Sequence, residues 1–149
     1  MSAALLMMAA LAGCSHAISV NVPVPSLGDA TSDTAVKDRC SAVTATLPQT
    51  LGKASKVNAS PASALTAAWA DGDKAVTLTC GLPVAHTPTE SLITVDGVAW
   101  RVQKHTDGTQ FTAVDRVVAV TLTVPSAAMP AAAYLSGLAL PIAVAAPAK

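Results

Sequence analysis

Two Asp-Gly dipeptides constrain the fold of this chain more than any other feature. Asp71-Gly72 separates residues 65–70 from 73–80, and Asp96-Gly97 separates residues 93–95 from 98–103. All four flanking segments are short and rich in apolar residues at alternate positions, as strands are. Asp-Gly is a favoured pair in the two-residue turns of β-hairpins. Two such hairpins predict an antiparallel sheet.

The register of each hairpin follows from its turn. With Asp71-Gly72 as a two-residue loop, Trp69 lies opposite Lys74 and Ala67 lies opposite Val76. With Asp96-Gly97 as the second loop, Ile93 pairs with Trp100. One apolar face is then predicted for the first hairpin, made of Leu65, Ala67, Trp69, Val76, Leu78 and Cys80.

Further strands follow a turn at residues 105–108. Residues 110–114 form one strand, and a last one carries Val118, Val120, Leu122 and Val124 on a single face. Asp115-Arg116 between them forms a tight turn or a bulge. We expect five to six strands in all, with Arg101 and Arg116 solvated or paired on the outer face of the sheet.

Two helices are expected to pack on this sheet, which makes the fold α+β. The first spans about residues 33–47, where Val36, Cys40, Val43 and Leu47 recur at helical spacing. The second spans residues 130–140, with Leu135 and Leu138 on one side. Residues 53–63 are expected to be a loop, and residues 87–90 a helical turn with a capping box. Residues 117–148 carry no charge, so a membrane span is an alternative for this stretch. Four prolines divide it into pieces that are too short to span a bilayer.

The N-terminal stretch predicts export. Residues 3–12 are apolar and too short to span a bilayer, and Leu11-Ala12-Gly13-Cys14 resembles a lipobox. A lipobox implies a signal peptide over residues 1–13, and a diacylglyceryl group and a fatty acid such as palmitate on Cys14. The alternative is a buried core cysteine. No Lys or Arg precedes Lys37, which departs from the basic start of a signal peptide.

Residues 14–32 are interpreted as a linker that contains prolines, and residues 33–149 as a single domain. An edge strand over residues 18–24 is the alternative to the linker, although Pro23 disfavours it. With Cys14 acylated, Cys40 and Cys80 remain, and both lie on predicted apolar faces. A disulfide between them is expected, because exported domains permit disulfides. The sequence contains no Cys-x-x-Cys spacing, so a metal site at these cysteines is not expected.

Motifs for catalysis are scarce. Neither a phosphate-binding loop nor a hydrolase or zinc-protease motif occurs, so no cofactor and no metal are expected. His86 with Glu90, or His105 with Asp107, can in principle make a base and the acid that orients it. Trp69 and Trp100 fall on core faces, where packing is favoured over a ligand platform. Basic and acidic residues balance at nine each, so nucleic acid is not an expected partner.

Several stretches together carry a family resemblance. They are the lipobox, the cysteine of the first helix, and residues 67–71, 78–83, 95–100 and 111–114. They resemble a family of small actinobacterial lipoproteins that is known only as a domain of unknown function. The resemblance spans about residues 14–140 and implies an exported, lipid-anchored envelope protein in which Cys40 and Cys80 are paired. It implies no activity.

Two classes of function stay open. The first is a non-enzymatic binding or assembly module on the outer face of the cytoplasmic membrane, held by the lipid on Cys14. Its partner would be an envelope protein or the cell wall. The second is a small envelope hydrolase or transferase that uses His86, Glu90, His105 or Asp107.

Overall fold

The computed structural model describes residues 17–28 and 30–149, and for residues 30–33 it describes the backbone alone. The proposed signal peptide and Cys14 therefore lie outside the described residues. The strands are β1 (Ser19–Asn21), β2 (Thr50–Leu51), β3 (Ala54–Ser60), β4 (Thr66–Asp71), β5 (Lys74–Gly81), β6 (Leu92–Val95), β7 (Val98–Lys104), β8 (Gly108–Ala113) and β9 (Ala119–Pro125). The helices are α1 (Ala30–Ala45), the 3-10 turn η1 (Ser126–Ala128) and α2 (Ala132–Ala145).

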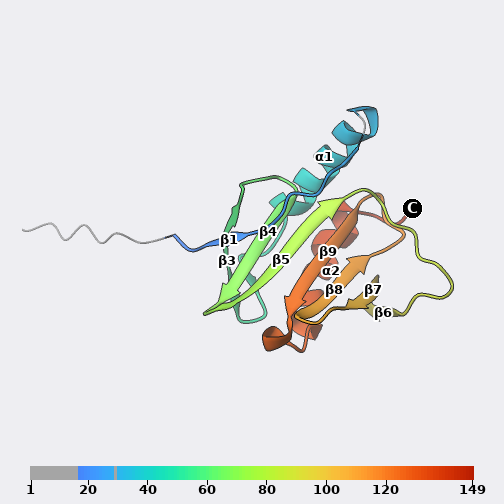
Figure 1. The fold of residues 1–149 in the computed structure, drawn as a ribbon. Coiled ribbons are helices and arrows are strands. Elements are labelled where there is room, and N and C mark those ends of the chain that lie inside the picture. The colour runs from blue at the N-terminus through green and yellow to red at the C-terminus, as the bar shows by residue number, and fades with distance from the viewer. Residues whose placement is uncertain (1–16, 29) are drawn as a thin grey trace, which may run out of the picture.

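The strands form one mostly antiparallel sheet in the order β1-β3-β4-β5-β9-β8-β7-β6, and β2 also pairs with β3 (Figure 1). The pairing of β1 with β3 is parallel. The α+β class is confirmed. The expected five to six strands are wrong, because the described residues form nine.

The additional strands are β1, β2 and β3. Residues 53–63 were expected to be a loop, but β3 pairs with β4 through Ser55, Lys56 and Val57. Its sequence lacks a clean apolar alternation, because beyond the buried Ala54 the residues on both faces of β3 are exposed or only partly buried. β1 is the edge-strand alternative to a free linker, and the residues that follow it also pack on the domain. Val22 and Leu27 are buried, and Leu27 lies 3.7 Å from the position that a Cβ would take at Gly81.

The predicted register is correct for one hairpin and wrong for the other. In β6–β7, Ile93 pairs with Trp100 and Val95 with Val98, so the predicted register is confirmed. In β4–β5, Trp69 pairs with Val76 and Asp71 with Lys74, so the predicted register was wrong by two residues. The loop is Gly72-Asp73, and a glycine with φ of +64° at its first position suits a type II′ turn. A shift of two residues keeps every side chain on its face.

The core lies between the sheet and the two helices (Figure 1). All six residues predicted for the inner face of the first hairpin are buried, as are the four predicted for the inner face of the first helix, Val36, Cys40, Val43 and Leu47. Cys40 and Cys80 form a disulfide with a Cα–Cα separation of 5.5 Å, which confirms the expected link between helix and sheet. Both cysteines are fully buried.

The helices differ from expectation mainly at their ends. α1 begins at Ala30 and ends at Ala45, two residues before the expected end. α2 continues through Pro141 to Ala145, although a proline was expected to end it. The buried Ile142 and Ala145 anchor this last turn in the core, which outweighs the lost backbone hydrogen bond. Within the described part of the chain, no helix is both long and apolar enough to cross a membrane.

Candidate functional site

Two ion pairs border the loop of residues 82–91, which we call the β5–β6 loop. His86 of this loop contacts Asp115, which lies between β8 and β9. The His86 Nδ1 is 2.5 Å from an Asp115 carboxylate oxygen, and the His86 backbone N–H donates to the other oxygen at 3.3 Å. Both side chains are about half-exposed, at 45% and 46%. The His86 Nε2 is therefore the ring nitrogen left for another partner.

The backbone around Asp115 holds this carboxylate in place. Asp115 has a φ of +57°, a region that Asp tolerates better than most residues. Its N–H donates to the Val84 carbonyl at 2.9 Å, and its carbonyl accepts from the Lys149 N–H at 3.0 Å. The loop, the β8–β9 connection and Lys149 thus meet at one residue, Asp115.

Glu90 does not pair with His86, which corrects the first expected acid–base pair. One Glu90 carboxylate oxygen accepts from the Thr87 backbone N–H at 2.9 Å, and the other accepts from the Arg101 guanidinium at 3.1 Å. The Glu90 N–H donates to the Thr87 carbonyl at 3.0 Å. Half of the expected capping box is therefore present, because the Glu90 side chain reaches back to the Thr87 N–H but the Thr87 hydroxyl contacts Thr89 instead of the Glu90 N–H. The segment forms a turn, and no helix follows it. Arg101 is paired on the outer face, as expected.

The same hydrogen bonds lower the pKa values of Asp115 and Glu90. The hydrogen bond from His86 lowers the pKa of Asp115, and partial desolvation opposes this shift. The backbone N–H of Thr87 is the main cause of a lowered pKa at Glu90, and the Arg101 guanidinium adds to it. Both carboxylates are therefore ionised over a wider range of pH than free ones.

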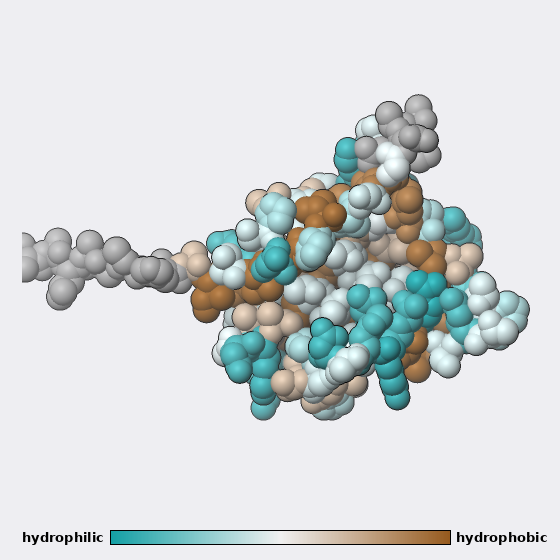
Figure 2. Space-filling model, in the orientation of Figure 1, coloured by the Kyte–Doolittle hydropathy of each residue, from teal (hydrophilic) through white to brown (hydrophobic). Residues whose placement is uncertain are grey.

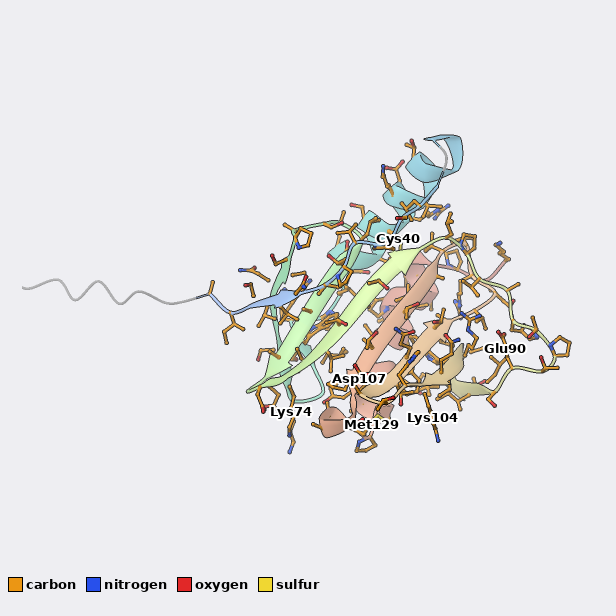
Figure 3. The ribbon with its side chains drawn as sticks, viewed as in Figure 1. Cys40, Lys74, Glu90, Lys104, Asp107 and Met129 are labelled. Carbon is orange, nitrogen blue, oxygen red and sulfur yellow. A yellow bond between two sulfur atoms is a disulfide. The ribbon has the colours of Figure 1, made fainter. Side chains whose placement is uncertain are left out.

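His105 and Asp107 lie elsewhere. The expected turn is confirmed, because the His105 N–H donates to the Gly108 carbonyl at 2.8 Å. Their side chains share no hydrogen bond in the described structure, and they line a shallow depression with Gln110 and Thr123. Figure 3 shows Asp107 near Lys104 at one end of the sheet and Glu90 on the protruding loop, so the two candidate sites are separate.

Arg116 departs most from expectation. It was expected on the outer face, but it is only 9% exposed. Its guanidinium donates to the Ala146 carbonyl at 3.2 Å and to the Gly97 carbonyl at 3.3 Å. Ala146 caps the C-terminal end of α2, where a cation is favoured by the helix dipole. Arg116 therefore joins α2, the β6–β7 turn and the β8–β9 connection.

The tryptophans pack in the core rather than forming a platform, because Trp69 and Trp100 are both fully buried. The Trp69 N–H donates to the Pro48 carbonyl at 3.0 Å. The Trp100 N–H is buried and has no hydrogen-bond partner among the residues that the structure describes. Across the described ranges, no three His, Cys, Asp or Glu side chains gather in a way that can hold a metal ion.

Sequence reasoning missed Asp115 and Arg116 as partners. His86 and Asp115 are 29 residues apart, and Arg116 and Ala146 are 30 apart, so no local spacing connects them. The only local signal was an acidic and a basic residue in the short connection between two strands.

Comparison with known proteins gives a family. The model of a family described as a protein of unknown function, DUF3515, matches residues 1–149. The chain belongs to the DUF3515 family. No curated protein and no solved structure matches it. This membership confirms the expected domain of unknown function.

Proposed function

We propose that this DUF3515 protein is an exported, lipid-anchored binding or assembly module on the outer face of the cytoplasmic membrane. The observation that carries the proposal is the buried disulfide between Cys40 and Cys80. Disulfides form and persist in oxidising compartments and are rare in the cytosol. The apolar residues 3–12 and the lipobox that ends at Cys14 support the same location. The anchor is a diacylglyceryl group on Cys14, as in the actinobacterial lipoproteins that the chain resembles.

The open edge of β6 is the surface best suited to a partner. β6 is the last strand of the sheet, and its residues Leu92 and Ile93 are 37% and 40% exposed. The Val102 N–H donates to the Ser91 carbonyl, and bonded and non-bonded pairs alternate in antiparallel strands. The backbone groups of Leu92 and Thr94 therefore point away from β7, toward the open side.

The composition of this edge also favours pairing. Exposed edge strands usually carry a charged residue or a proline that blocks the addition of another strand. Residues 92–95 are Leu-Ile-Thr-Val and carry neither. The partner that fits is an extended, mainly apolar segment of another envelope protein, which adds to the sheet through backbone hydrogen bonds.

The anchor is tested by metabolic labelling with a fatty-acid analogue. The wild-type protein should be labelled, and the C14S variant should lose the label and accumulate as unprocessed precursor. In spheroplasts, added protease should digest the wild-type domain without lysis. Labelling that persists in C14S, or protection of the domain until lysis, would contradict the proposal.

The partner surface is tested by a photo-crosslinking residue in place of Thr94, with Gln103 as the matched position. Both side chains are exposed, but Gln103 lies on β7, away from the open edge. A defined adduct from Thr94 alone is expected, together with its loss in the I93K variant, which places a charge on the edge. The same partner should co-purify from detergent-solubilised envelope. Equal crosslinking at both positions would argue against a role for β6.

A small hydrolase or transferase is the second candidate, and the His86–Asp115 pair is the observation that favours it. A carboxylate at Nδ1 leaves Nε2 free to act as a general base. Among the described residues, no hydroxyl or thiol is hydrogen-bonded to the ring of His86, so the base would have to activate water or a substrate group. Turnover of ester or amide substrates that is lost in both H86Q and D115N would support this candidate. Turnover that both variants retain would remove it.

A further inference from the structure

The length of chain between the anchor and the first strand limits where the domain can lie. β1 begins at Ser19, so only four residues separate it from Cys14. A fully extended chain covers at most about 3.6 Å per residue, so Ser19 lies within about 18 Å of Cys14. If residues 15–32 were all free linker, as predicted from the sequence, the domain could lie several times farther from Cys14. An acylated Cys14 therefore keeps the start of β1 beside the membrane.

The surface at the start of β1 is formed by three segments that meet there. Ala17 and Ile18 border a shallow groove together with Gln49 and residues Lys56, Val57 and Asn58 of β3. The Asn58 N–H donates to the Ile18 carbonyl at 3.3 Å, which fixes Ile18 at this edge. Figure 2 shows hydrophobic surface beside the point where the described chain begins. We call these six residues the tether surface.

The tether surface has the chemistry of a membrane contact. Ile18 is 61% exposed, although a large apolar side chain at that exposure gains from leaving water. Lys56 is the one charged member, no acidic residue lies in the set, and the described structure shows no ion pair for Lys56. Anionic headgroups attract a nearby lysine and would repel a carboxylate.

We propose that the tether surface rests on the anionic bilayer that holds the Cys14 anchor, with Ile18 at the headgroup boundary and Lys56 against lipid phosphates. This rests on the proposed anchor. The contact is intramolecular once the anchor is inserted, so one apolar side chain and one cation suffice to hold an orientation that they would not hold in solution. β6 lies at the other end of the strand order and stays free of the bilayer.

The test compares two lysines of the full acylated protein in vesicles that contain phosphatidylglycerol. A water-soluble amine reagent is added, and labelling of Lys56 is measured relative to Lys104 on β7, first on vesicles and then in detergent. We expect the ratio to fall several-fold on vesicles. Inserting ten Gly and Ser residues after His16 should restore it, and so should I18E, which leaves the tether length unchanged. An unchanged ratio on vesicles, or a lowered ratio that neither variant relieves, would overturn the proposal.

A failure of the anchor is distinguishable from a failure of the surface. Mass spectrometry of the protein from cells shows whether Cys14 is acylated. If it is not, the Cys14 thiol of a chain that begins there is joined to a maleimide lipid. This is selective because the other two cysteines are bonded to each other. A several-fold fall in the labelling ratio of that conjugate supports the tether surface, and an unchanged ratio overturns it.

Discussion

The disulfide region, made of α1, β4 and β5, is joined by a covalent bond between two fully buried cysteines. The loop region, made of the β5–β6 loop, β6, β7 and residues 115–116, is joined by two ion pairs that solvent reaches. In the first region the N–H of the buried Trp69 is hydrogen-bonded to the Pro48 carbonyl. The second contains a buried arginine and a tryptophan N–H without a partner. Local exceptions to good packing are expected where a protein binds or acts. From this comparison we expect the disulfide region to contribute most of the stability, and we propose that the loop region is where a partner binds.

The disulfide should make the largest contribution to stability. The bond closes a loop of 40 residues, which corresponds to about 4 kcal/mol in the chain-entropy model. Urea unfolding of the C40A/C80A double variant should show a loss of about that size. The wild-type protein treated with reductant serves as the control for the effect of the substitutions. A loss below about 1 kcal/mol would mean that the two regions do not differ as described.

Arg116 should be the most costly charged residue to replace. R116M leaves the Ala146 and Gly97 carbonyls without their donor, for an expected loss of about 3 kcal/mol. The matched control is R101M, which breaks a partly exposed pair with Glu90 and should cost much less. Both are measured by urea unfolding. Equal losses would show that the burial of Arg116 does not determine how much stability its replacement costs.

Much of the inner face was predictable from the sequence, because period and turn chemistry are local. The apolar faces of β4, β5 and β9 followed from spacing. The partner of Cys40 followed from the two cysteines that remain if Cys14 is acylated, both of which lie on predicted apolar faces. β3 was not predictable, because its strand conformation depends on pairing with three other strands. The partners of His86 and Arg116 were missed because contacts across 29 and 30 residues leave no periodic signal.

The two buried tryptophans give a direct comparison of the regions. W69F removes a donor that the Pro48 carbonyl uses, whereas W100F removes an N–H that has no partner. Both lose similar volume, so W69F should cost about 1 kcal/mol more than W100F. Thermal or urea unfolding measures the difference. A W100F variant that is the less stable of the two would contradict this assignment of the indole groups.

Lowering the pH should destabilise the loop region, and this effect should be smaller than those of the substitutions above. The pKa values of Asp115 and Glu90 are lowered in the folded protein, so their contribution is present above their unfolded pKa values. That contribution is lost as the pH falls through the lower folded values, below about pH 4. Amide hydrogen exchange of the β5–β6 loop should rise there relative to β5. In D115N the rise should shrink, because the titrating group is gone. An identical acid response in D115N would contradict the role of the pair.

The intact mass of the protein taken from the membrane fraction is the most direct test of an exported, lipid-anchored and disulfide-bonded domain. The protein is alkylated under denaturing conditions, once before and once after reduction. We expect a chain that begins at an acylated Cys14 and takes up two alkyl groups only after reduction. An unprocessed chain that begins at Met1 and shows three free thiols without reductant would contradict both the anchor and the disulfide.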